Sequence, residues 1–133
     1  MDELIYSDIF GDLLDRQTTG IIEIRWFDST SQMAGSEVQG WLERFAAALE
    51  QPGRRFALVD TNAFRMDSAQ MDTEWRDSYI IPRYNAAGVE RFAFHMPPGM
   101  PAIGQPAQAE GLAQFPTAYF SSRNDALEWL GAS

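Results

Sequence analysis

Two side chains with acid–base chemistry stand at the ends of two short apolar runs. Asp60 ends the run 55–60, and His95, the single histidine of the chain, ends the run 89–95. Ligands commonly bind at the carboxyl ends of neighbouring strands in an α/β sheet, so we expect Asp60 and His95 to share one edge of a sheet. An imidazole at that edge suits a ligand contact. The alternatives are that His95 packs at its strand end and that Asp60 caps the following turn.

Asp67 and Ser68 come a few residues later, where a helical pattern begins. Both residue types are common at helix starts, because their side chains accept hydrogen bonds from backbone N–H groups that lack a partner in the helix. Helix capping is therefore one interpretation of the pair. A phosphate on Ser68 would also suit this position, since the helix dipole and the open backbone donors favour negative charge there.

Methionines and other apolar side chains follow in the second helical pattern and in the loop after His95. Met71 and Trp75 belong to the helix, and Met96, Met100 and Ile103 belong to the loop. Flexible methionines beside aromatic rings suit a surface that adapts to apolar partners. Two interpretations follow: these side chains cover the open end of a sheet, or they bind an apolar ligand, a lipid or a second copy of the chain.

The composition excludes several classes of chemistry. The chain has no cysteine, so disulfides, thiolate metal sites and cysteine nucleophiles are absent. All ten basic residues are arginine, which excludes a Schiff-base lysine and a phosphate-loop lysine. Against these stand nineteen acidic residues, and the resulting net charge of −9 repels a phosphate backbone. With one histidine and no glycine-rich cradle, we expect no metal, no cofactor and no nucleic-acid partner.

The amino-terminal and hydropathy patterns bear on location. The first ten residues, MDELIYSDIF, carry acids where a secretory signal has a basic start. The longest apolar stretches have about six residues, whereas about twenty are needed to cross a bilayer. We therefore expect a cytoplasmic protein with no membrane span.

The 133 residues suit a single domain over 1–133, and the order of apolar patterns predicts an α/β fold. Residues 4–27 predict three strands in an antiparallel meander, with Gly11 and Asp12 as the first turn. A helix over 36–51, a buried strand to Asp60, a helix from Asp67 to a stop at Gly88 and a buried strand to His95 follow. After a proline-rich loop over 96–114 come a strand over 117–120 and a capped closing helix. The expected architecture is a mixed sheet of about six strands, parallel at its centre, with three to four helices.

The third strand of the meander alternates in polarity. Ile22, Ile24 and Trp26 share one face, and Glu23 and Arg25 lie on the other. The alternation predicts that one face covers the core and that Glu23 and Arg25 face water.

The element order and the tail 119–130, YFSSRNDALEWL, resemble the SpoIIAA-like branch of the STAS superfamily. The strand 90–94, ERFAF, is similar to the penultimate strand of that branch, and the resemblance covers residues 21–130. It implies a STAS-type sheet, which is similar in fold to lipid-binding Sec14-type domains. In anti-anti-sigma factors of this superfamily, a strand ending in Asp leads to Met-Asp-Ser at a helix start, as Asp60 leads to 66–68 here. The serine there is phosphorylated by a partner kinase, so the resemblance implies a regulatory role for Ser68.

The sequence thus predicts a non-catalytic binding or regulatory module, with a protein-interaction switch at Asp67 and Ser68. The alternative is a carrier or sensor of an apolar small molecule or lipid, in a cleft beside the 96–114 loop. A third reading is an enzyme that uses His95 or Asp60. No second catalytic group converges on either residue in the sequence pattern, which places the enzyme last.

Overall fold

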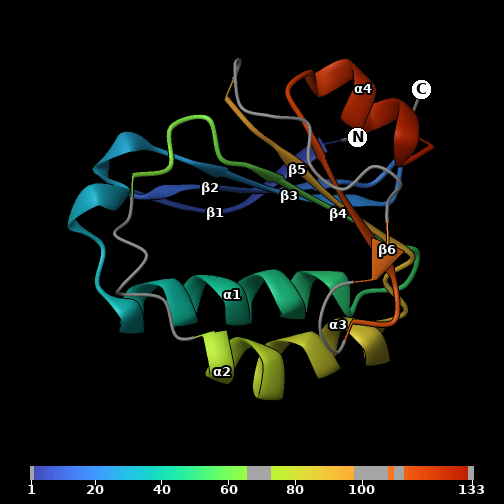
Figure 1. Ribbon diagram of the computed structural model, residues 1–133, viewed down its shortest axis with the longest axis horizontal. Helices are drawn as coiled ribbons and strands as arrows, with labels where there is room; N and C mark the ends of the chain where they lie inside the picture. The colour runs from blue at the N-terminus through green and yellow to red at the C-terminus, as the bar shows by residue number, and fades with distance from the viewer. Residues whose placement is uncertain (1, 66–72, 98–107, 110–112, 132–133) are drawn as a thin grey trace.

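A mixed β-sheet with helices on both faces forms the centre of the computed structural model (Figure 1). The structure describes residues 2–65, 73–97, 108–109 and 113–131. The strands are β1 (Asp2–Asp8), β2 (Gly11–Arg16), β3 (Ile21–Trp26), β4 (Phe56–Asp60), β5 (Arg91–His95), β6 (Gln108–Ala109) and β7 (Pro116–Phe120). Their order across the sheet is β1-β2-β3-β4-β5-β7-β6. The predicted α/β fold with an antiparallel start and a parallel centre is confirmed.

The antiparallel meander has its first turn earlier than predicted. Asp8 pairs with Gly11, so Ile9 and Phe10 form the turn and the prediction of Gly11 and Asp12 was wrong. Gly11 is needed for another reason, because a Cβ at this position would lie 2.4 Å from the carbonyl oxygen of Arg25 on β3. Gly11 is therefore needed for the close contact between β2 and β3, and not for the conformation of a turn.

The parallel centre brings β3, β4, β5 and β7 side by side. Ala57, Leu58 and Val59 on β4 are buried, as expected for a strand covered on both faces. Among the described residues of the predicted loop over 96–114, Gln108 and Ala109 form the short strand β6, which pairs antiparallel with β7. This pairing places β6 at one edge of the sheet, and β1 forms the other edge.

Two helical segments cover one face of the sheet, and α4 covers the other (Figure 1). The first face carries α1 (Gly35–Leu49) and a continuous helical segment made of α2 (Thr73–Trp75), the π-helical η3 (Arg76–Ile80) and α3 (Ile81–Ala87). The opposite face carries α4 (Arg123–Trp129), and a short 3-10 helix, η1 (Asp28–Gln32), links β3 to α1. The predicted three to four helices are confirmed.

Local sequence signals explain where these helices begin and end. The Glu37 side chain accepts a hydrogen bond of 2.8 Å from the Ala34 N–H at the start of α1. Pro82 lies in the first turn of α3, where a missing N–H is tolerated, so the helical segment continues through it. Gly88 ends α3 with a φ of 85°. Ser122 caps α4 by accepting a hydrogen bond of 3.4 Å from the Asp125 N–H.

Strand alternation gives the sheet two different buried faces. The face beneath α1 and α3 holds the larger core, which includes Ile24, Trp41, Phe45 and Phe92. The face beneath α4 holds a smaller core made of Ile21, Leu58, Ala93, Ala126 and Leu130. In the text below, the first is called the α1 face and the second the α4 face.

The prediction that Glu23 faces water was wrong. The Glu23 side chain has no exposed surface and lies on the α4 face. Its strand alternates between apolar and polar residues, but the closing helix covers the polar side as well. Arg25 agrees better with the prediction, because 42% of its side chain is exposed.

Candidate functional site

Asp60 and His95 lie side by side at the carboxyl ends of β4 and β5, as predicted. Their side chains are partly buried, with exposed fractions of 23% and 15%, and 3.8 Å separates Asp60 Oδ1 from His95 Nδ1. Asn62 joins them: its Nδ2 donates to Asp60 Oδ1 at 2.8 Å and lies 3.2 Å from His95 Nδ1. Asn62 therefore bridges the two side chains at this edge of the sheet.

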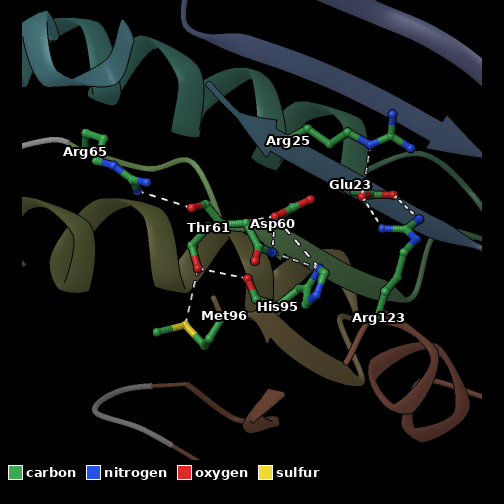
Figure 2. A network of polar contacts seen from close by, with 9 residues as sticks. Glu23, Arg25, Asp60, Thr61, Arg65, His95, Met96 and Arg123 are labelled. Atoms are coloured by element: carbon green, nitrogen blue, oxygen red, sulfur yellow. Dashed lines mark hydrogen bonds and ion pairs between the residues drawn. The ribbon is translucent and has the colours of Figure 1, made fainter. Parts of the chain in front are cut away.

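Thr61, the residue after β4, also connects the end of β4 to the end of β5. Its backbone N–H and its hydroxyl each lie 2.9 Å from the carbonyl oxygen of His95. The hydroxyl also lies 3.3 Å from the Met96 sulfur, which places that side chain against the loop after β4 (Figure 2). These contacts hold the two strand ends in one fixed arrangement.

The loop after Thr61 is fixed by a contact to η1. The Arg65 N–H donates a hydrogen bond of 2.8 Å to Thr30 Oγ1, and Thr30 is fully buried. This bond keeps Phe64 over the Trp26 ring, with 5.4 Å between the ring centroids. Phe64 thereby becomes part of the wall of a cavity on the α1 face.

The cavity has a volume of about 410 Å³ and lies between the sheet and the helices of the α1 face. Strands contribute every second residue, as the alternation of side chains requires. The described lining residues are Ile24, Trp26, Val38, Leu42, Phe45, Val59, Thr61, Phe64, Arg76, Ile81, Tyr84, Phe92, Phe94, Ala113, Phe115, Thr117 and Tyr119. Its size falls within the range of about 300–1,000 Å³ that is typical of small-molecule sites.

The cavity wall is aromatic and carries few polar groups. Tyr84 contacts the rings of Phe45, Phe92 and Phe115 at centroid distances of 5.8, 5.7 and 6.4 Å. Burial raises the pKa of the Tyr84 phenol, and the charge of Arg76 lowers that pKa by a smaller amount. Tyr84 is therefore neutral at physiological pH, and its hydroxyl remains a hydrogen-bond donor.

Arg76 is the one charged side chain among the described lining residues. It begins the π-helical segment η3, in which the Ile81 N–H bonds to the Arg76 carbonyl oxygen five residues earlier. Segments of this kind are rare and often occur at functional sites. The Arg76 Nε atom is buried, so part of its guanidinium group lies in a low-dielectric wall.

A cluster of charged side chains lies on the α4 face. Arg123 from α4 donates to both Glu23 oxygens, with Nη1–Oε2 at 2.6 Å and Nη2–Oε1 at 2.9 Å (Figure 2). Arg16 Nε donates to Glu23 Oε1 at 2.7 Å, and Arg25 Nε lies 3.5 Å from Oε2. Burial opposes the ionisation of Glu23, but the hydrogen bonds and charges of Arg123 and Arg16 outweigh it and lower its pKa. We call these four residues the Glu23 cluster.

The structure separates side chains that the sequence grouped together. By strand alternation Asp60 and His95 lie on the α4 face, whereas the cavity is on the α1 face. Thr61 lines the cavity and contacts Met96, so it connects the strand ends to the cavity wall. Trp75 packs partly buried against the larger core and stacks on Tyr79 at 5.4 Å.

Several predicted site residues lie outside the part of the chain that the structure describes. They are Asp67, Ser68, Met71, Met100 and Ile103. The hypothesis of a phosphorylated Ser68 therefore stays a prediction.

The sequence suggested an apolar cleft beside the 96–114 loop as an alternative, and Ala113 of that segment lines the cavity. Sequence reasoning did not identify Arg76, Asn62 or the Glu23 cluster. Phe92 and Phe94 are two residues apart on one strand, and Thr117 and Tyr119 are two apart on its neighbour, so each pair lies on one face of the sheet. The three rings on that face were a usable sequence signal for an aromatic wall. Within the described residues, no group of three or more acidic or histidine side chains could hold a metal ion. No described helix is both long enough and apolar enough to cross a bilayer.

Comparison of the chain with protein-family models, with curated proteins and with solved structures found no match in any of the three. The geometry of the cavity and of the strand ends therefore carries the functional conclusion.

Proposed function

We propose that this protein is a non-catalytic binding module that carries or senses an apolar small molecule in the cavity of the α1 face. The cavity itself is the observation that supports the proposal, since well-packed interiors hold few voids larger than a water molecule. A volume of about 410 Å³ is far above that limit.

The lining favours a flat, apolar ligand. Trp26, Phe64, Phe94 and Tyr119 present aromatic rings to the cavity, and Phe94 and Tyr119 are stacked at 5.1 Å. Aromatic side chains prefer offset or edge contacts with other rings, which a planar ligand can make on several sides. Thr61 and Arg76 supply polar groups that can fix the orientation of the ligand.

Binding is proposed instead of turnover because the acid–base pair is in the wrong place for the cavity. Asp60 and His95 lie across the sheet from the cavity lining. Their contacts with Asn62 connect the ends of two strands, which is a structural role.

The proposal agrees with the resemblance to the SpoIIAA-like branch of the STAS superfamily. The element order β1-β2-β3-α1-β4, then helix, β5, β7 and α4, is the order on which that resemblance depends. The similarity of that branch to lipid-binding domains makes an apolar ligand a reasonable occupant.

A fluorescence titration with the neutral probe N-phenyl-1-naphthylamine tests the proposal. We expect saturable binding of one probe per chain, with enhanced probe emission, because the probe moves from water into an apolar site. The Ala113→Phe variant should weaken binding at least tenfold, because Ala113 is buried in the cavity wall and a phenyl ring there fills the space.

The matched control is Ala47→Phe, which adds the same ring at an exposed position of α1. This variant should bind the probe as the wild type does. Absence of saturable binding by the wild type, or equal loss in both variants, would contradict the proposal. Separately, native mass spectrometry of the purified protein would identify any small molecule retained from the expression host.

A further inference from the structure

Two buried hydroxyl groups belong to residues of the cavity wall. Tyr84 is 2% exposed and Thr117 is 5% exposed, and both residues line the cavity. Neither hydroxyl forms a hydrogen bond with any residue that the structure describes. Buried polar groups in native proteins nearly always have a partner, so two such groups without one require an explanation.

Other buried polar side chains in the described part of the chain do have partners. The Asp15 carboxylate accepts a hydrogen bond of 2.8 Å from Arg54 Nε. The Thr30 hydroxyl oxygen accepts one of the same length from the Arg65 N–H, and Glu23 lies among its arginines. The lack of a partner is therefore a feature of the cavity wall and not of the described interior in general.

The two hydroxyl-bearing residues lie at the same end of the cavity. Thr117 on β7 pairs with Phe92 on β5, and the Phe92 ring lies 5.7 Å from the Tyr84 ring, between centroids. The ring of Phe115, two residues before Thr117 in the chain, lies 6.4 Å from the Tyr84 ring. A single polar group on a ligand can therefore approach this end while its apolar body contacts the aromatic wall.

We infer that the ligand of this cavity is an apolar ring compound with an acceptor oxygen, such as that of a ketone, which accepts a hydrogen bond from the Tyr84 hydroxyl. The inference rests on the proposed function, because it assigns a chemical class to the ligand of the same cavity. A phenol is a better donor than acceptor, since its ring withdraws electron density from the oxygen. Burial raises the pKa of the Tyr84 phenol, so the proton that it donates is retained at physiological pH.

An acceptor on the ligand removes a cost that the buried hydroxyl imposes on the unliganded protein. The hydroxyl loses its hydrogen bonds with water on folding, and no described residue replaces them. A ligand oxygen restores one bond in a low-dielectric environment, where hydrogen bonds are stronger than in water. A hydrocarbon of the same shape fills the space but leaves the hydroxyl unpaired, so the cavity should distinguish the two.

A matched pair of probes tests the acceptor. 9-Fluorenone and fluorene share one flat three-ring frame, and the carbonyl group of the first is a methylene group in the second. Displacement of N-phenyl-1-naphthylamine gives a dissociation constant for each probe. The ratio of the fluorene constant to the fluorenone constant should be about threefold to tenfold larger in the wild type than in Tyr84→Phe, which is the size of one net hydrogen bond.

The matched control is Tyr6→Phe, which removes a hydroxyl that donates to Asp8 Oδ2 at 2.9 Å from a residue outside the cavity lining. This control should keep the wild-type ratio. Thermal unfolding without ligand should show Tyr84→Phe to be at least as stable as the wild type, because the ring stays and an unpaired hydroxyl is lost. Tyr6→Phe should be less stable, because it loses a hydrogen bond.

The infrared spectrum of bound 9-fluorenone tests the same bond in the wild type, without any variant. A hydrogen bond weakens a carbonyl double bond, so the stretching frequency of the bound ketone should be lower than its frequency in hexane. In Tyr84→Phe the frequency should return toward the hexane value. The Tyr6→Phe control should give the wild-type frequency.

The outcomes separate the inference from the proposed function. A ratio that is the same in the wild type and Tyr84→Phe, with N-phenyl-1-naphthylamine still bound, would overturn the acceptor at Tyr84 and leave the apolar cavity in place. A carbonyl frequency in the wild type equal to that in hexane would overturn it as well. Failure of all three probes to bind would contradict the proposed function and the inference together.

Discussion

The two faces of the sheet bury their side chains in different ways. The α1 face holds large aromatic residues and leaves a cavity of about 410 Å³. The α4 face holds a smaller core beside the Glu23 cluster, in which the carboxylate has no exposed surface. The same strands supply both faces, so the difference comes from the residues on alternate positions and from the helices that cover them.

The buried charge and the cavity therefore lie on opposite faces of the sheet. The α4 face encloses a full charge by giving it three arginine partners. The α1 face keeps a void, which costs dispersion contacts unless a ligand fills it. We therefore expect the α4 face to serve stability and the α1 face to serve binding.

The largest effect should follow from removing the charge of Glu23. Glu23→Gln keeps the shape of the side chain but leaves the three arginines without their carboxylate. Breaking a buried ion pair by removing one partner costs about 3–5 kcal/mol. Urea unfolding at pH 7 measures this loss.

The control is Glu90→Gln, which removes an exposed carboxylate 3.5 Å from Arg55 Nε. An exposed pair contributes about 0–1 kcal/mol, so the control should be close to the wild type. The pKa of Glu23 is lowered in the folded state, so its contribution is present above the ordinary value of 4.5 and is lost as the pH falls through the lower folded pKa. The gap between the wild type and Glu23→Gln should therefore shrink in acid, and a gap that does not depend on pH would contradict the charge argument.

An intermediate effect should distinguish the packing of the two faces. Leu58 is fully buried in the smaller core, and Leu58→Ala should lower the free energy of unfolding by about 2–5 kcal/mol. Leu42 lines the cavity and is only partly buried, so Leu42→Ala should cost about 1 kcal/mol. Thermal or urea unfolding of both variants gives the comparison. If the two losses are equal, the α1 face is packed as tightly as the α4 face.

The smallest effect should come from the link between the strand ends and the cavity. Thr61→Val removes the hydroxyl that lies 2.9 Å from the His95 carbonyl oxygen, and should cost about 0.5–1.5 kcal/mol. Thr19→Val is a matched control, since its hydroxyl bonds only to Arg16 three residues earlier in the same turn. Calorimetric unfolding should show a larger loss of unfolding free energy for Thr61→Val than for Thr19→Val. The reverse order would contradict the role of the Thr61 hydroxyl in holding the two strand ends together.

Local patterns predicted much of the fold. The apolar runs, the caps and the glycine stops gave the order of strands and helices, since each depends on residues close together in the chain. The adjacency of Asp60 and His95 also followed, because parallel strands joined by a helix place their carboxyl ends at one edge. The turn at Ile9 and Phe10 was missed, because Gly11 serves a contact with Arg25 on another strand.

The sequence by itself determined the α/β class and the neighbouring strand ends, because short-range periodicity encodes them. Only the tertiary structure decided that Glu23 is buried, since its partner Arg123 lies one hundred residues further along the chain. It alone also decided that the cavity exists, because a void depends on how side chains from four strands and two helical segments fit together. Packing between distant segments has no local signature in the sequence, and in this protein that packing supplies the candidate site.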